Sequence, residues 1–107
     1  MNYYNYGRAA NDGLRHRLEG SVRLLQQDVE AKRGDAIQVR YRGNEAKVLV
    51  MNKMNFFKYT AGASFKHLGG QYSRFPVCIS VPESGKWYVV VQVEESATAT
   101  DPSITVI

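Results

Sequence analysis

The chain has 107 residues, enough for one domain, and its hydrophobic fraction of 44% and charged fraction of 22% are typical of a folded protein rather than a disordered one. No apolar run approaches the roughly 20 residues that a membrane-spanning helix needs, and a single cysteine excludes an internal disulfide. The formal net charge is +4, with five Lys or Arg against Glu83 alone in residues 53–86, so the middle of the chain favours an anionic partner.

Residues 1–20 differ from the rest of the chain and are interpreted as an N-terminal extension. Tyr3, Tyr4 and Tyr6 lie among Asn and Gly with no periodic pattern. Because tyrosine offers a large contact area with a polar tip, these three residues are candidates for binding a partner. A disordered tail is the alternative interpretation.

The segment 11–29 allows two interpretations. Five apolar residues fall on one stripe of a helix: Leu14, Leu18, Val22, Leu25 and Val29. The alternative is a short helix to about Glu19, a break at Gly20 and a strand from Ser21 to about Gln27. We favour the second, which agrees with the family resemblance described below.

From residue 34 onward the pattern has the period of two expected of strands. Ile37, Val39 and Tyr41 alternate with polar residues, Val48 and Val50 share one side of their segment, and Trp87, Val89, Val91 and Val93 share one side of theirs. The alternating segments lie near residues 37–41, 47–51, 77–81, 87–93 and 104–106, separated by turn residues such as Gly43-Asn44 and Ser84-Gly85. Short strands between turns predict a mainly β fold, a small antiparallel β-sandwich of jelly-roll type. Residues 21–107 are expected to form this single domain, preceded by the extension, part of which is expected to be helical.

Several separated motifs resemble one family in their order along the chain. They read G-D-x-I-x-V, G-N-x-A-x-V-x-V-M, N-F-x-x-Y-x-x-G, G-G-x-x-x-R-x-P-V and V-P-x-S-G-x-W-Y-V-V-V. Over about residues 22–107 the chain resembles the bacterial domain of unknown function 1883 family. The resemblance implies a small β-rich sandwich and, because some members share a chain with a TIR domain, a link to bacterial immunity. It implies no catalytic residues.

The segment 52–75, expected to be a long loop, is the best candidate site because it combines six aromatic residues with basic ones. Aromatic faces stack on bases, cations neutralise phosphates, and paired glycines let backbone N–H groups approach an anion. The candidate ligand-binding residues are Lys58, Tyr59, Lys66, His67, Gly69, Gly70, Tyr72 and Arg74. The alternative is a connection that closes one end of the sandwich, in which Phe56, Phe65 and Phe75 fill the core and the lysines are solvated.

A second candidate surface lies earlier in the chain. Arg40 and Arg42, with Lys47, are expected to share the outward face of adjacent strands, where they would meet an anion or a partner protein. The alternative is that these charges protect an edge strand from aggregation.

The sequence offers little for catalysis. It has two histidines, His16 and His67, and Cys78, which alternates with apolar residues and is expected to be packed. No metal-ligand spacing or nucleophile motif occurs, so we expect no enzyme activity, metal or cofactor.

We therefore expect a cytoplasmic, non-enzymatic binding or accessory module that recognises a protein partner, a second copy of itself, or an anionic or nucleotide-like ligand. Nucleic acid is a further candidate partner, and no membrane partner is expected. The alternative is a structural protein of a phage or capsid that uses the N-terminal arm for oligomer contacts.

Overall fold

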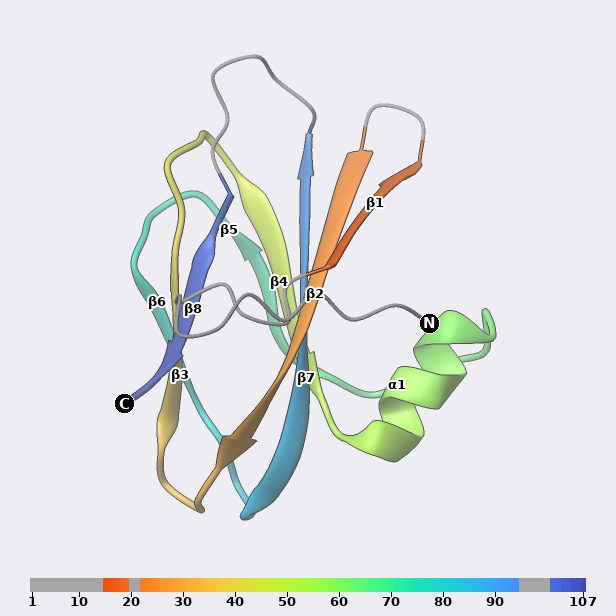
Figure 1. Ribbon diagram of the computed structural model, residues 1–107, viewed down its shortest axis with the longest axis vertical. Coiled ribbons are helices and arrows are strands. Elements are labelled where there is room, and N and C mark those ends of the chain that lie inside the picture. The colour runs from red at the N-terminus through yellow and green to blue at the C-terminus, as the bar shows by residue number, and fades with distance from the viewer. Residues whose placement is uncertain (1–14, 20–21, 95–100) are drawn as a thin grey trace.

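The computed structural model describes residues 15–19, 22–94 and 101–107, and within them two antiparallel sheets pack face to face with a helix beside one of them (Figure 1). The strands of the large sheet are, in spatial order, β1 (Arg15–Glu19), β2 (Val22–Ala31), β7 (Gly85–Glu94), β4 (Ala46–Met51) and β5 (Leu68–Tyr72). Those of the small sheet are β6 (Val77–Ser80), β3 (Ala36–Arg40) and β8 (Ser103–Val106). The helix is α1 (Lys53–Thr60). The predicted mainly β sandwich is confirmed.

The inner core lies between the two sheets and is built from alternate residues of their strands, as the period of two predicts. On the large sheet these are residues such as Val48, Val50, Val89 and Val91, and on the small sheet Ile37, Val39, Ile79 and Ile104. Trp87 belongs to the same cluster.

Two predicted turns connect strands of different sheets rather than neighbours in one sheet. The segment around Gly43 leads from β3 in the small sheet to β4 in the large one, and Ser84 lies between β6 and β7 in the same way. The ring of Tyr41 lies so close to Gly43 that a Cβ there would be 2.3 Å from it. Tyr41 also contacts Phe75 edge to face, with ring centroids 5.5 Å apart. A larger residue at this crossover would have to displace the Tyr41 ring.

The predicted short helix before Gly20 is wrong for residues 15–19, which form β1 and pair with β2. The strand predicted from Ser21 to Gln27 is confirmed within β2 and continues to Ala31. The spacing of four residues between Leu14, Leu18 and Val22 suits a helix, but it is also a multiple of the strand period. Pairing with a long central strand decides between the two.

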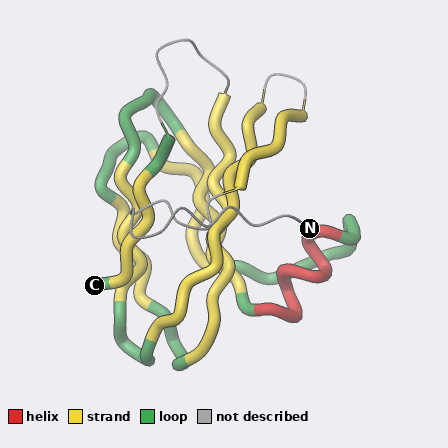
Figure 2. Tube along the Cα trace, viewed as in Figure 1, coloured by secondary structure: helices red, strands yellow, loops and turns green. Residues whose placement is uncertain are grey.

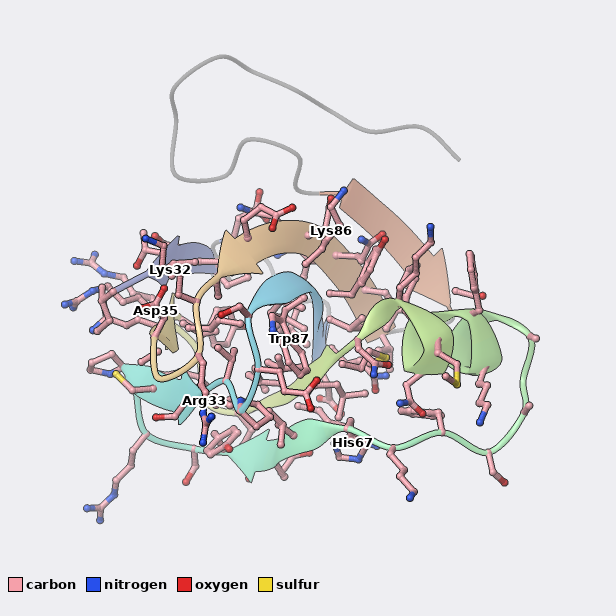
Figure 3. All side chains as sticks on the ribbon, turned by 90° about the horizontal axis from the view of Figure 1, so that it is seen from below. Lys32, Arg33, Asp35, His67, Lys86 and Trp87 are labelled. Atoms are coloured by element: carbon pink, nitrogen blue, oxygen red, sulfur yellow. The ribbon has the colours of Figure 1, made fainter. Side chains whose placement is uncertain are left out.

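One end of the sandwich is closed by hydrogen bonds between the turn after β2 and the turn before β7. The N–H of Gly34, which has a positive φ of 89°, donates to the Val81 carbonyl (3.0 Å), and the Val81 N–H donates to the Asp35 carbonyl (2.9 Å). Nearby, the Arg33 N–H donates to Ser84 Oγ (2.8 Å). Figure 3 views this end, with Trp87 in the middle and Lys32, Arg33 and Asp35 to one side.

The same closed end explains two of the sequence motifs. The Asp35 carboxylate accepts the N–H of Lys32 (2.8 Å), and the Trp87 indole N–H donates to the Glu83 carbonyl (3.0 Å). The G-D and V-P-x-S-G-x-W residues therefore hold the two sheets together, which is a structural role.

The outer face of the large sheet carries a second apolar cluster. Leu49, Met51, Tyr88 and Val90 point away from the small sheet and are covered by Phe56 of α1. The expectation of a long loop over 52–75 is therefore wrong, because this segment contains α1 and β5 (Figure 2). The apolar residues on this face need a cover, and the helix supplies it.

Candidate functional site

Helix α1 has well-defined ends that its sequence explains. Asn52 is the N-cap, and its Oδ1 accepts the N–H of Asn55 (3.0 Å). At the other end Gly62 has a positive φ of 77° and its N–H donates to the Tyr59 carbonyl, while the Ala63 N–H donates to the Lys58 carbonyl. This pair of bonds is a Schellman motif, which satisfies the last carbonyl groups of the helix.

Aromatic packing attaches α1 to the large sheet. The ring of Phe56 stacks on Tyr88 with centroids 4.4 Å apart, and Phe56 is only 6% exposed. Tyr59 contacts Phe65 edge to face at 5.1 Å, and its hydroxyl accepts a bond from Gln92 Nε2 (3.3 Å). The face of α1 toward the sheet is thus fully used by the fold.

The loop after α1 is fixed against the helix. The N–H of Lys66 donates to Asn55 Oδ1 (2.8 Å), and Asn55 Nδ2 donates to Asn52 Oδ1 (2.9 Å). The N-F-x-x-Y-x-x-G motif therefore consists of Asn55, Phe56, Tyr59 and Gly62, each of which holds α1 in place. The motif leaves the intervening positions unspecified.

The opposite face of α1 is apolar and exposed. Met54 and Phe57 are 63% and 59% exposed, and with Ile107 they are the large hydrophobic side chains that stand exposed among the described residues. Lys53 Nζ lies 5.7 Å from the centroid of the Phe57 ring, a cation–π contact. Lys58 and Ala61 are exposed beside them. We call Lys53, Met54, Phe57, Lys58 and Ala61 the α1 surface.

The predicted ligand-binding residues divide between the two faces of the large sheet. Tyr59 packs on the outer cluster, and the exposed Lys58 and Lys66 lie on α1 and in its loop, with His67 against the Phe65 ring at 5.6 Å. Tyr72 packs instead on the inner core. Arg74 is exposed in the segment between β5 and β6. The structure therefore brings the first group together around α1 and places Tyr72 elsewhere.

Gly69 and Gly70 lie within β5, where the first has a clear role in the fold. Gly69 has a positive φ of 88°, and a Cβ there would lie 2.2 Å from the Val48 carbonyl oxygen. Gly70 pairs with Val48 and has open space around it. The close approach of β5 to β4 accounts for Gly69 without an anion.

The predicted stripe of Arg40, Arg42 and Lys47 is wrong as a shared face of adjacent strands. Arg40 is exposed on β3 of the small sheet, whereas Lys47 is exposed on β4 of the large sheet. Arg42 is exposed in the crossover between them. The arginines stay candidates for partner binding, and Tyr3, Tyr4 and Tyr6 lie outside the described residues.

His67 and Cys78, two of the side chains considered for catalysis, lie in or beside strands of different sheets. His67 is exposed just before β5, and its Nδ1 lies 3.0 Å from the Leu68 carbonyl oxygen. Cys78 belongs to β6 of the other sheet; it is exposed, contrary to the expectation that it is packed, because it points outward between the inward Val77 and Ile79. Within residues 15–19, 22–94 and 101–107, no group of three or more His, Cys, Asp or Glu side chains is placed to hold a metal ion.

Lys53, Met54 and Phe57 lie within the candidate segment 52–75 but were not among the predicted ligand-binding residues. The signal for them was the capping pattern: Asn52 before, and Gly62 after, a segment with Phe56 and Tyr59 three residues apart. Once that segment is a helix, Met54 and Phe57 fall on its other face.

Comparison with known proteins gives the family. In the described part of the chain no helix has the length and hydropathy needed to cross a membrane. No curated protein and no solved structure matches the sequence. The model of the family described as domain of unknown function (DUF1883) matches residues 22–107, from the first residue of β2 to the end of the chain. The chain thus belongs to the DUF1883 family.

Proposed function

We propose that this domain is a non-enzymatic binding module that recognises an acidic partner protein through the α1 surface. The observation that carries the proposal is the exposure of Met54 and Phe57, at 63% and 59%, on a helix whose other face is already packed. Exposed apolar side chains that lie together and are rimmed by polar ones are typical of interaction sites.

The charge around α1 supports an acidic partner. No Asp or Glu occurs between Glu45 and Glu83, whereas this stretch holds four lysines and Arg74. Lys53, Lys58 and Lys66 are exposed on α1 and in its loop. Exposed lysines on a segment without Asp or Glu attract anionic groups and repel basic ones.

A nucleotide is a less suitable ligand. A nucleotide site would need Lys58, Lys66, Tyr72 and Arg74 around one concave surface, and Tyr72 packs on the inner core, away from the outer cluster under α1. The α1 surface is a convex ridge, which suits a macromolecular partner. A link of that partner to TIR-type immunity rests on the family resemblance alone.

Chemical-shift mapping tests the proposal with poly-L-glutamate as the probe and poly-L-lysine as its control. We expect the amide signals of α1 and of residues 61–67 to shift with poly-L-glutamate alone, and the shifts to fade as salt is added. Lys58→Glu should abolish them, whereas Lys32→Glu, a charge reversal at an exposed lysine in the turn after β2, should leave them. Shifts confined to β3 and the crossover, or no shifts at all, would contradict the proposal.

A further inference from the structure

We propose that the partner segment is an acidic amphipathic helix that lies across α1, with apolar side chains on Met54 and Phe57 and carboxylates on Lys53 and Lys58. The inference rests on the proposed function and names the class of ligand that the α1 surface takes. Four features of the surface support it: its pattern, its shape, its charge and its size.

The pattern follows from helix geometry. At about 100° per residue, Phe57, Ala61 and Met54 fall within an arc of about 60° on the exposed side of α1. Lys53 lies about 40° beyond Phe57, and Lys58 about 40° beyond Met54. The surface is therefore an apolar stripe with one lysine on each side, the arrangement of an interface core and its rim.

The shape of the surface favours a helix as the ligand. Met54 and Phe57 are three residues apart, so their side chains form a short ridge along α1. Ridges of this kind pack into the grooves between side chains of a second helix. The eight residues of α1 extend about 12 Å, which matches roughly two turns of a crossing helix.

The charge excludes a second copy packed symmetrically on the same surface. In a two-fold arrangement α1 would meet α1, and both lysine rims would face lysines. Like charges across an interface disfavour the pair, whereas carboxylates of an acidic helix would meet both rims at once. A protein segment with acidic flanks therefore suits the α1 surface better than a second α1 does.

Two other anionic partners fit less well. Single-stranded nucleic acid uses several aromatic platforms, and on α1 the Phe57 ring is exposed while Phe56 is buried and Tyr59 half-buried. A bilayer is held by a longer amphipathic helix than the eight residues of α1. Both are outcomes of the test below.

The test uses the full chain and a synthetic helical peptide of about 14 residues, with leucines on one stripe and glutamates beside them. The controls are a scrambled peptide of the same composition without the stripe, and a peptide with glutamine in place of each glutamate. Titration calorimetry should show the striped acidic peptide binding at least about tenfold more tightly than either control.

Variants of the protein locate the binding. Phe57→Ala and Met54→Ala should each weaken binding of the striped peptide by about tenfold. Because both side chains are exposed, neither substitution should lower the midpoint of thermal unfolding. Lys58→Glu should weaken it further and reduce its dependence on salt. Lys32→Glu, at an exposed lysine in the turn after β2, is the matched control and should bind as the unchanged protein does.

The possible results distinguish a failure of this inference from a failure of the proposed function. If the striped and scrambled peptides bind equally and Phe57→Ala has no effect, the α1 surface binds acidic chains without reading a helix; this inference then fails while the proposed function stands. If neither peptide nor poly-L-glutamate binds at about 1 mM, both fail. Tighter, Phe57-dependent binding of a deoxythymidine oligonucleotide, or of vesicles of phosphatidylglycerol and phosphatidylcholine in equal parts, also overturns the inference.

Discussion

The two apolar clusters on the two faces of the large sheet differ in how they are built and in what they leave exposed. The inner core joins strands of both sheets and is closed at one end by the bonds between Gly34, Asp35 and Val81. The outer cluster joins two strands, β4 and β7, to a single short helix and its loop. The inner core defines the fold, and the outer cluster holds in place a helix whose far side faces solvent.

The difference shows how a small β-sandwich can hold an exposed helix face apart from its core. Residues of the inner core face only other core residues, so a change there alters the fold. Residues of α1 divide into those that hold the helix, such as Phe56 and Tyr59, and those that meet solvent, such as Met54 and Phe57. The side chains that hold α1 on the sheet and those that face solvent are therefore different residues of one element.

The inner core should give the largest loss of stability on truncation. Ile37 is fully buried, so Ile37→Ala leaves a cavity between the sheets and is expected to lower the free energy of unfolding by about 2–5 kcal/mol. Ile107→Ala, at an exposed position, should change it by less than about 0.5 kcal/mol. Urea denaturation followed by tryptophan fluorescence measures both. Equal effects would show that the inner core is not the main source of stability.

The close approach of β5 to β4 gives the next effect. Gly69→Ala places a Cβ against the Val48 carbonyl oxygen at a positive φ, and we expect a loss of about 2 kcal/mol or more in the free energy of unfolding. Gly70→Ala is the control, because a Cβ there meets open space, and it should be neutral within about 0.5 kcal/mol. The same urea titrations apply. A tolerated Gly69→Ala would return this glycine to the list of ligand-binding candidates.

The outer cluster should give the smallest and most local effect. Phe56→Ala is expected to cost about 1–3 kcal/mol, because α1 and its loop can open while the two sheets stay paired. Phe57→Ala, one residue along, should cost less than about 0.5 kcal/mol. Hydrogen exchange should show faster exchange in α1 for the first variant and unchanged exchange in β2 and β7. Faster exchange throughout would mean that the two clusters unfold as one unit.

The strands were predictable because their alternation reports burial on one face. The sequence predicted which residues of the segments near 47–51 and 87–93 share a side, and the inner core contains one such set. It did not predict which strands pair, since β3 and β4 are consecutive in sequence and lie in different sheets. Alternation carries no information about the sheet to which a strand belongs.

Helix α1 was missed because its eight residues contain no long apolar period. The evidence for a helix lay outside it: Leu49, Met51, Tyr88 and Val90 make the second face of two strands apolar as well. A strand that is apolar on both faces must be covered on both, and residues 53–60 follow β4 directly. The exposed pair Met54 and Phe57 becomes visible only after the helix is placed.

The position of β7 in the chain determines the order in which this domain can fold. In the large sheet β7 lies between β2 and β4, and residues 32–84 separate Ala31 from its partner Gly85. During synthesis β2 and β4 therefore emerge without their common neighbour, and the large sheet stays divided until β7 follows. Joining its two parts requires a contact between distant parts of the chain, which slows folding. A nascent chain that ends before Gly85 has no central strand and is the form that needs protection from aggregation.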